Sequence, residues 1–465
     1  MERCTRRLLW FFVVLFLLLS AQLTYLQVYA APRLNADPSN TRAIEAQMRV
    51  ERGLIVTRDG VELARNTKDA PYFLRTYPEG SLAAPWVGYN SLRYGRAGIE
   101  RVYNAELAGE LDALQIRNLI DVVTGRPRRG ADLILTVDSQ VQAAAVEALG
   151  ARPGAVVALD PRTGAVLAWT SYPRYDPNNL EGQWDALIAD PGKPLFDRAT
   201  SGLYPPGSVF KVVTGAAALQ EGRVKPETKF DDTGGFVAGG YKVVNFDGRV
   251  FGEHDFAQAM ISSVNTTFAK VGVDLGAAIL AQYASAFGLG EPLPWNLGGR
   301  TGSFPDPAKM DTAHVAQVSY GQGELLVSPF GMALVASGIA NGGQIMMPHV
   351  VEEVRDYRQT VIARTQPRVW RRAVSAETAR QITELMVRVV EEGTGTNAAI
   401  RNVKVAGKTG TAEVGNGEAH AWFICFAPAD DPQVAVAVIV ENGGSGGGVA
   451  APVAKHVLET ALARR

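Results

Sequence analysis

At residues 204–211 the chain reads Tyr-Pro-Pro-Gly-Ser-Val-Phe-Lys, and this stretch decides how the rest is interpreted. Two prolines and a glycine predict a sharp turn, and the mostly apolar run that continues to Gln220 predicts a buried helix. Ser208 and Lys211 lie one turn apart and share a face of that helix. A lysine in the first turn lies at the unfavourable end of the helix dipole, and burial lowers its pKa further. A neutral amine beside a hydroxyl is a general base beside a nucleophile.

A bare Ser-x-x-Lys also occurs by chance, with the lysine reaching from an apolar helix to solvent. Two later motifs decide between these interpretations. Ser263-Val-Asn265 lies between two apolar helical stretches, and Lys408-Thr409-Gly410-Thr411 lies at the start of a strand-like segment. In this order the three motifs are the signature of penicillin-binding proteins and serine β-lactamases.

The chain resembles the class B, monofunctional penicillin-binding proteins over nearly its whole length. The segments that carry this resemblance are 52–64, 203–211, 406–413 and 419–428. Two further segments, 34–42 and 88–95, resemble the compact penicillin-binding protein A branch of the actinobacteria. The resemblance implies an α+β transpeptidase domain, in which helices flank an antiparallel sheet, behind a small N-terminal pedestal and one transmembrane helix.

The bulk composition allows a large core and more than one domain. The chain has 465 residues, of which 47% are hydrophobic and 20% are charged, and its net charge is −1. Such a charge favours no nucleic-acid partner. The two cysteines, Cys4 and Cys425, lie on either side of the apolar N-terminal segment. They would be on opposite sides of a membrane, and we expect Cys425 to be buried in a strand.

The N-terminus has the charge pattern of an exported protein. Three arginines precede the unbroken apolar run Leu8–Leu19, and a weaker apolar stretch continues to Ala31. One helix over both stretches is long enough to span a bilayer with the arginines in the cytoplasm. A cleaved signal peptide that ends near Ala30 is the alternative that composition leaves open. The family resemblance implies the uncleaved anchor, hence a single-pass membrane protein with an extracytoplasmic catalytic domain.

We divide the chain at two points. Residues 1–31 form the cytoplasmic stub and anchor, 32–150 the pedestal, which is dimerisation-like, and 151–465 the penicillin-binding transpeptidase domain. The sequence predicts a strand 131–137, a helix to 149 capped by Asp138 and a hairpin 155–170. Further predicted helices are 256–262, 265–273, 329–340 with Ser328 as its cap, 376–392 and 449–463. Further predicted strands are 403–414, 419–426 and 434–441. Residues 225–252 are rich in glycine and turn-like, and Asp197 needs a partner for its charge, for which we choose Arg198.

Nucleotide and metal chemistry find no support in the sequence. A phosphate-binding loop around Gly407-Lys408-Thr409 requires a glycine at position 402, which is Asn402. The five histidines show no paired metal spacing. We therefore expect no cofactor and no metal. His420 flanks the predicted active-site strands and is as well explained by a structural role as by substrate contact.

The resemblance implies a role for each motif residue. Ser208 is the nucleophile, Lys211 takes its proton, Ser263 relays that proton to the leaving amine, and Asn265 orients Lys211. Lys408 supplies positive charge near Ser263. The substrate-binding residues are Lys408, Thr409, Gly410 and Thr411. The oxyanion is expected between the backbone N–H groups of Ser208 and Thr411.

The implied donor is a peptidoglycan stem peptide that ends in D-Ala-D-Ala, and the acceptor is an amine on a neighbouring stem peptide. β-Lactam antibiotics would acylate Ser208 as mimics of the donor. A multi-span membrane glycosyltransferase of the wall-synthesis machinery is the expected partner, in division or elongation. Two alternatives stay open: a hydrolase on the same site (a D,D-carboxypeptidase or a β-lactamase) and a β-lactam sensor or scaffold.

Overall fold

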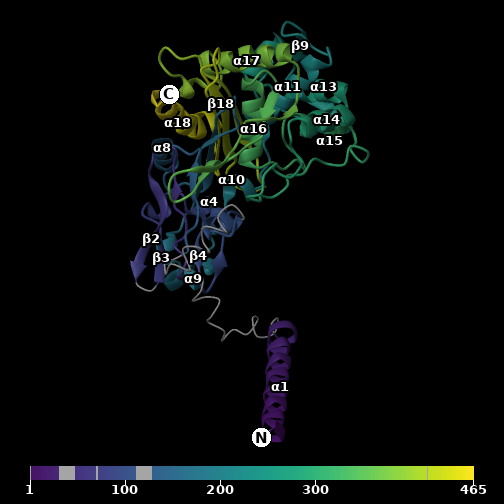
Figure 1. Cartoon of the computed structure of the whole chain (residues 1–465). Helices are drawn as coiled ribbons and strands as arrows, with labels where there is room; N and C mark the ends of the chain where they lie inside the picture. Colours follow the sequence, from purple (N-terminus) through teal and green to yellow (C-terminus); the bar gives the residue numbers. More distant parts are fainter. Residues whose placement is uncertain (1, 31–47, 70–71, 112–127, 416, 465) are drawn as a thin grey trace.

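A computed structural model describes residues 2–30, 48–69, 72–111, 128–415 and 417–464. Figure 1 shows a long N-terminal helix, a small domain that contains β2, β3 and α4, and a larger domain that contains the C-terminus. We call the small domain the pedestal and the larger one the C-terminal domain. The segment 34–42, which contributed to the family resemblance, lies outside the described residues.

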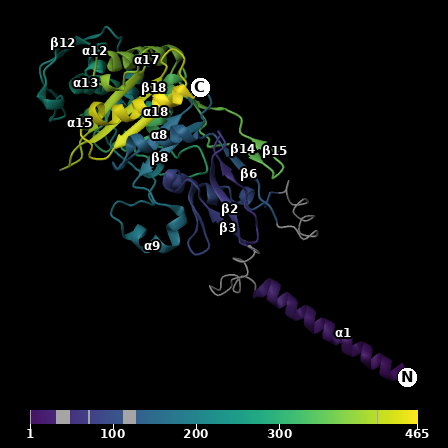
Figure 2. The ribbon, with the colours of Figure 1, turned by 90° about the vertical axis from the view of Figure 1, so that its left-hand side faces the viewer.

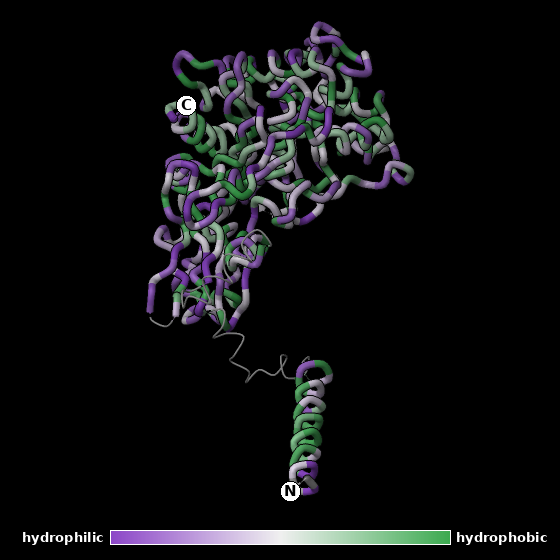
Figure 3. The backbone as a smooth tube through the Cα atoms, in the orientation of Figure 1, coloured by the Kyte–Doolittle hydropathy of each residue, from purple (hydrophilic) through white to green (hydrophobic). Residues whose placement is uncertain are grey.

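The N-terminal helix is one continuous element. Helix α1 (Glu2–Thr24) continues as a π-helical turn over Tyr25–Tyr29. The stretch Thr5–Tyr29 is long and apolar enough to cross a membrane, and none of it packs against the rest of the protein. The colouring in Figure 3 marks the residues along most of this helix as hydrophobic. The predicted single apolar helix is therefore present.

The pedestal is built on a six-stranded sheet in the order β15-β14-β6-β1-β2-β3. Its strands are β1 (Ile55–Val56), β2 (Glu62–Asp69), β3 (Tyr72–Thr76), β6 (Asp132–Leu135), β14 (Val351–Arg355) and β15 (Val361–Arg364). The first four come from the N-terminal part of the chain, and the last two arrive from the C-terminal half, as Figure 2 shows. Short elements complete the pedestal: α4 (Ala84–Val87), β4 (Asn90–Ser91), β5 (Gly95–Arg96), α5 (Gly98–Val102) and α6 (Asn104–Leu107).

The C-terminal domain is organised around a five-stranded antiparallel sheet in the order β17-β18-β19-β7-β8. The strands are β7 (Gly154–Leu159), β8 (Val166–Tyr172), β17 (Ala406–Ala412), β18 (His420–Ala427) and β19 (Val434–Val440). Alternation along β18 sends Trp422 and Ile424 into one core, and Phe423 and Cys425 into the other. Helices cover both faces, which confirms the α+β class. Cys425 is buried and free, as expected.

Each face of this sheet has its own helical layer. Helices α8 (Ser139–Leu149) and α18 (Ala451–Ala463) pack on one face, and α11 (Lys211–Gln220), α16 (Pro329–Ala340) and α17 (Ala376–Glu391) lie on the other. The predicted caps are present, because Asp138 and Ser328 accept hydrogen bonds from the first-turn amides of α8 and α16. The remaining larger helices are α9 (Leu180–Ala189), α12 (Phe256–Ile261), α13 (Asn265–Leu275), α14 (Ala277–Ala286) and α15 (Thr312–Ser319).

The pedestal and the C-terminal domain share one continuous core. Trp86 of α4 stacks on Trp169 of β8, with ring centroids 5.9 Å apart, and its indole N–H donates to the Trp169 carbonyl at 2.6 Å. Trp169 stacks in turn on Trp295. Helix α8, which we assigned to the pedestal, packs in the core that α18 lines. The division at residues 31 and 150 stays a prediction.

The structure differs from the sequence prediction at Asp197 and at residues 225–252. Arg198 is not the partner of Asp197, because the Arg198 guanidinium donates to Glu441 at 2.8 Å. Asp197 instead accepts hydrogen bonds from the Trp169 indole at 3.1 Å and the Thr200 hydroxyl at 2.6 Å. Burial raises the pKa of Asp197 to about 6, and the hydrogen bonds from these neutral donors offset only part of that rise. Residues 225–252, expected to be turn-like, also contain the short strands β9 (Lys229–Asp232), β10 (Phe236–Ala238) and β11 (Tyr241–Val243), while β12 (Gly252–Asp255) begins at their end.

Candidate active site

Ser208 lies on a 3-10 turn, Gly207–Phe210, that leads directly into α11. Gly207 has a φ of 56°, a left-handed conformation that glycine adopts without a steric cost. Its amide donates to the Gly321 carbonyl at 2.8 Å, which ties the turn to the loop after α15. The predicted turn followed by a buried helix is therefore confirmed. Ser208 is partly exposed and lines a cavity, while Lys211 is fully buried.

Lys211 is held by three oxygen atoms from the Ser263–Asn265 motif. Its Nζ lies 2.7 Å from the Ser263 carbonyl oxygen, 2.7 Å from Asn265 Oδ1 and 3.2 Å from Ser263 Oγ. The Phe268 ring lies 5.3 Å away. Burial, and secondly the charge of Lys408, lower the pKa of Lys211 well below its ordinary value. The environment of Lys211 therefore favours the neutral amine over the ammonium form.

The Ser263–Asn265 motif lies at the junction of α12 and α13. Ser263 has a φ of 60°, which is unusual for a residue other than glycine and costs on the order of 1–3 kcal/mol. This conformation aims both its carbonyl and its hydroxyl at Lys211. A second hydrogen bond orients the side-chain amide of Asn265. Its Nδ2 donates to the Val244 carbonyl at 3.1 Å, so that Oδ1 faces Lys211.

Lys408 approaches the same serine from β17. Its Nζ lies 2.8 Å from Ser263 Oγ and 3.1 Å from the Thr409 carbonyl oxygen. The side chain is fully buried, and burial lowers the pKa of Lys408 to about 7. Ser263 Oγ therefore sits between two lysine amines. A hydroxyl in this position can accept from one amine and donate to the other, as a proton relay requires.

Strand β17 is at the edge of its sheet, and this edge runs past the Ser208 turn. Gly410 makes the approach possible, because a Cβ there would lie 3.0 Å from the Pro206 carbonyl oxygen. Thr411 is half-buried and lines the cavity. Thr409 is buried, and its hydroxyl lies 2.6 Å from the Thr394 hydroxyl. A ligand that binds the Thr409 hydroxyl must therefore share it with Thr394.

The predicted catalytic and substrate-binding residues gather at one cavity of about 570 Å³. Of the predicted residues, Ser208, Ser263, Asn265, Thr409 and Thr411 line it. Lys211 and Lys408 do not line the cavity themselves. Each lies behind its wall and contacts the Ser263–Asn265 motif by hydrogen bonds. The remaining lining residues, which sequence reasoning missed, include Tyr241, Val244, Phe246, Arg249, Tyr320, Gln322, Thr394, Glu413 and Ser445. No spacing pattern marks them, because they are brought in from separate loops by the fold.

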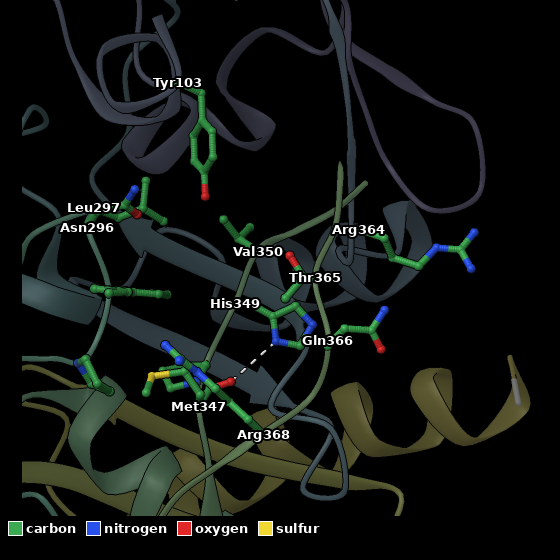
Figure 4. A pocket seen from close by; sticks show the side chains of 13 residues that line it. Tyr103, Asn296, Leu297, Met347, His349, Val350, Arg364, Thr365, Gln366 and Arg368 are labelled. Atoms are coloured by element: carbon green, nitrogen blue, oxygen red, sulfur yellow. Dashed lines mark hydrogen bonds between the residues drawn. The ribbon is translucent and has the colours of Figure 1, made fainter. Parts of the chain in front are cut away.

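A second cavity, of about 530 Å³, lies away from these residues, at the junction with the pedestal. Figure 4 shows Tyr103 reaching toward it from the pedestal, with His349 and Val350 on its wall. Arg364 and Arg368 stand at its border and are exposed. None of the motif residues lines it, so the candidate active site is the cavity at Ser208.

Comparison with protein families accounts for most of the chain. Residues 154–459 match the penicillin-binding protein transpeptidase domain. Residues 52–133 match the penicillin-binding protein A dimerisation domain. The first match contains all the motif residues of the site, and the second covers most of the pedestal.

Named relatives and solved structures agree with these matches. The chain is 40% identical to the peptidoglycan D,D-transpeptidase PbpA of Mycolicibacterium smegmatis, over 99% of each chain. It is 38% identical to the enzyme of that name in Mycobacterium tuberculosis, over 97% of this chain and 96% of the relative. The ceftriaxone acyl-enzyme complex of penicillin-binding protein A from M. tuberculosis superimposes with a TM-score of 0.86 at 37% identity, over 90% of this chain and all of that one. The three motifs, their convergence on one cavity and these likenesses lead to one conclusion: the chain belongs to the penicillin-binding protein transpeptidase family, with a pedestal of the penicillin-binding protein A type.

Proposed function

We propose that the protein is a peptidoglycan D,D-transpeptidase that cross-links stem peptides through an acyl-enzyme on Ser208. The observation that carries this proposal is the environment of Lys211. Two oxygens that can only accept, the Ser263 carbonyl and Asn265 Oδ1, lie 2.7 Å from its Nζ. A neutral amine has two N–H bonds and one lone pair. Because both N–H bonds are used by these acceptors, the lone pair is left for a proton from a hydroxyl.

In the first half-reaction Lys211 removes the hydroxyl proton of Ser208, and Ser208 Oγ attacks the carbonyl between the two terminal D-alanines of the donor. The backbone N–H groups of Ser208 and Thr411 would bind the oxyanion. The donor can lie beside β17 as an added strand, because β17 is the edge of its sheet. The Thr409 and Thr411 hydroxyls would hold the terminal carboxylate of the donor, next to Lys408.

The departing D-alanine needs a proton on its nitrogen. Ser263 Oγ can supply it and be reprotonated by Lys211, which lies 3.2 Å from it, while Lys408 at 2.8 Å stabilises the oxygen. In the second half-reaction an amine of a neighbouring stem peptide attacks the ester. The same residues then carry out the proton transfers in the reverse direction, from the attacking amine back to Ser208 Oγ. β-Lactams would stop at the first stage, as in the acyl-enzyme complexes of the M. tuberculosis relative.

The test of this activity is the reaction itself. The purified full-length chain, given un-cross-linked peptidoglycan strands, should produce cross-linked peptide dimers and release one D-alanine for each bond formed. Benzylpenicillin should abolish both. D-Alanine release without dimers would mean a carboxypeptidase, rapid destruction of the penicillin a β-lactamase, and neither reaction a sensor or scaffold.

We also propose that residues 1–31 stay attached as a single-pass anchor, with residues 32–150 as the pedestal and 151–465 as an extracytoplasmic catalytic domain. The support is the apolar helix Thr5–Tyr29. An anchored cross-linker gains from contact with the enzyme that polymerises the glycan, because tethering raises the effective concentration of its product. We infer a multi-span membrane glycosyltransferase as that partner.

The anchor and partner proposals share one experiment. Replacing Leu8–Ala31 with an unrelated membrane helix, or reversing the charge of the exposed Arg58 within Arg52–Ala64 by Arg58→Glu, should leave penicillin acylation intact. Co-purification with the glycosyltransferase and cross-linking in cells should fall. Full complementation by both variants would remove the partnership, and a mature N-terminus near Ala31 in membrane-extracted protein would remove the anchor.

A further inference from the structure

A cluster of exposed apolar side chains borders the active-site cavity. Outside the N-terminal helix, ten large hydrophobic side chains are exposed among the described residues, and five of them fall within residues 237–250. These five are Val237, Tyr241, Val244, Phe246 and Val250. We call residues 236–251, which lie between β9 and β12, the rim; Figure 2 shows β12 at the surface of the C-terminal domain. Exposed apolar side chains gathered in one short segment point to an interaction site.

Hydrogen bonds to a buried carboxylate fix the backbone of the rim. Asp232 is buried, and its carboxylate accepts hydrogen bonds from the Asn245 side chain and the Phe251 amide, each at 2.8 Å, and from the Thr266 hydroxyl at 2.9 Å. Thr266 belongs to α13, next to the catalytic motif. These contacts fix the base of the rim, so that its apolar side chains are presented to solvent by a held backbone.

The rim is continuous with the site. Val244, Phe246 and Arg249 line the same cavity as Ser208, and the Val244 carbonyl accepts the hydrogen bond that orients Asn265. The rim therefore stands on the Ser263 and Asn265 side of the cavity. Figure 1 shows β9, at its base, at the end of the C-terminal domain that is remote from β2 and β3 of the pedestal. A membrane partner bound to the pedestal is thus remote from the rim.

The direction of the reaction decides which substrate passes the rim. Because Ser263 protonates the leaving amine, that nitrogen lies beside Ser263 Oγ. The attacking amine must take the same position, since acyl transfer to one amine is the reverse of departure of another. The acceptor therefore enters from the Ser263 side, where the rim stands. The acyl part of the donor lies along β17.

We propose that the rim binds the acceptor strand, a glycan strand that carries un-cross-linked stem peptides. Val237, Phe246 and Val250 offer apolar contact to sugar faces and to peptide methyl groups. The Arg249 guanidinium, exposed beside them, suits a stem-peptide carboxylate. This inference rests on the proposed transpeptidase function and adds a specificity surface to it. A β-lactam, which resembles only the donor terminus, needs no contact with the rim.

The experiment compares two double variants of the full chain. Val237→Ser with Val250→Ser removes two exposed apolar side chains of the rim that do not line the cavity at Ser208. Val361→Ser with Val369→Ser removes two other exposed valines, one on β15 and one on β16 (Val369–Arg372), which do not line the cavity at Ser208. The probe is un-cross-linked peptidoglycan strands trimmed of both terminal D-alanines, which can act only as acceptors. Binding is measured by co-sedimentation with protein that also carries Ser208→Ala, so that no acylation interferes.

We expect the rim variant to bind the trimmed strands about tenfold or more weakly, because each buried apolar side chain contributes roughly that factor or more. The matched control should bind like the unaltered protein. With Ser208 restored, both double variants should react with fluorescent penicillin at the unaltered rate, while the rim variant should need more acceptor for half-maximal cross-linking.

Three outcomes would overturn the inference. The first is equal binding of trimmed strands by the rim variant and the control. The second is a loss of penicillin acylation in the rim variant, which would make the rim a support of the catalytic groups. The third is no binding of trimmed strands by any variant. Failure of the proposed function is separate, because it would appear as an unaltered protein that forms no cross-links even where trimmed strands bind.

Discussion

The variant Lys211→Met is expected to react with fluorescent penicillin about 10³-fold more slowly than the unaltered protein, within the range that general-base catalysis contributes. Methionine keeps the length of the side chain and its apolar contacts. It has no lone pair that can accept the Ser208 proton. Lys211→Arg should lose as much, because arginine remains protonated and cannot act as a base. The measurement is the second-order acylation rate constant of each purified variant.

The pH dependence separates a base from a merely structural lysine. In the unaltered protein the rate should fall as pH is lowered through the pKa of Lys211, because the protonated amine has no lone pair. This pKa lies well below the ordinary lysine value, so the fall in rate should occur at a lower pH than an ordinary lysine would give. The Lys211→Met and Lys211→Arg variants should lack this fall in rate at low pH. Lys229→Met, at a lysine that is 65% exposed, is the control and should keep both rate and profile. Acylation by Lys211→Met within tenfold of the unaltered rate would exclude Lys211 as the base.

The variant Glu100→Gln is expected to destabilise the pedestal by roughly 3–5 kcal/mol, the usual cost of removing one partner from a buried ion pair. Glu100 is fully buried, and its carboxylate lies 2.7 Å from the Arg52 guanidinium and 2.5 Å from that of Arg75. Burial opposes ionisation, yet the two arginines hold the pKa of Glu100 below its usual value. Glutamine has nearly the same shape but leaves two buried cations without a counter-charge.

Hydrogen exchange of the β2 and β3 amides in the full chain measures this loss directly. Glu62→Gln provides the matched control, since Glu62 pairs with Arg65 at 3.6 Å where both side chains are largely exposed. An exposed pair of this kind contributes about 0–1 kcal/mol. Equal exchange rates in the two variants would show that the buried carboxylate does not hold the pedestal together.

Much of the site could be predicted from the sequence because its chemistry depends on short-range spacing. Ser208 and Lys211 share a helix face, and Ser263 and Asn265 flank one residue, so each pair is positioned by local backbone geometry. The helices were predictable for the same reason, through caps such as Asp138 and Ser328. That the three motifs meet at Ser263 followed from family resemblance, and no pattern in the residues themselves requires it.

The rest depends on contacts between distant parts of the chain. Strand β14 pairs with β6 more than two hundred residues away, and nothing in its local pattern assigns it to the pedestal sheet. Arg198 was the nearest cation to Asp197 in sequence, yet it pairs with Glu441 from the end of β19. The sequence predicts turns in the rim because its two strands are each three residues long, too short for alternation to identify a face.

The central claim is that this chain forms an acyl-enzyme on Ser208, and mass spectrometry of the penicillin adduct tests it most directly. The purified full-length protein is incubated with a fluorescent penicillin, digested and sequenced. We predict one label on the peptide that contains Tyr204–Lys211, located on Ser208, stable for many minutes and absent from Ser208→Ala. A stable label on any other serine, or an unlabelled protein that leaves the penicillin intact, would contradict the account.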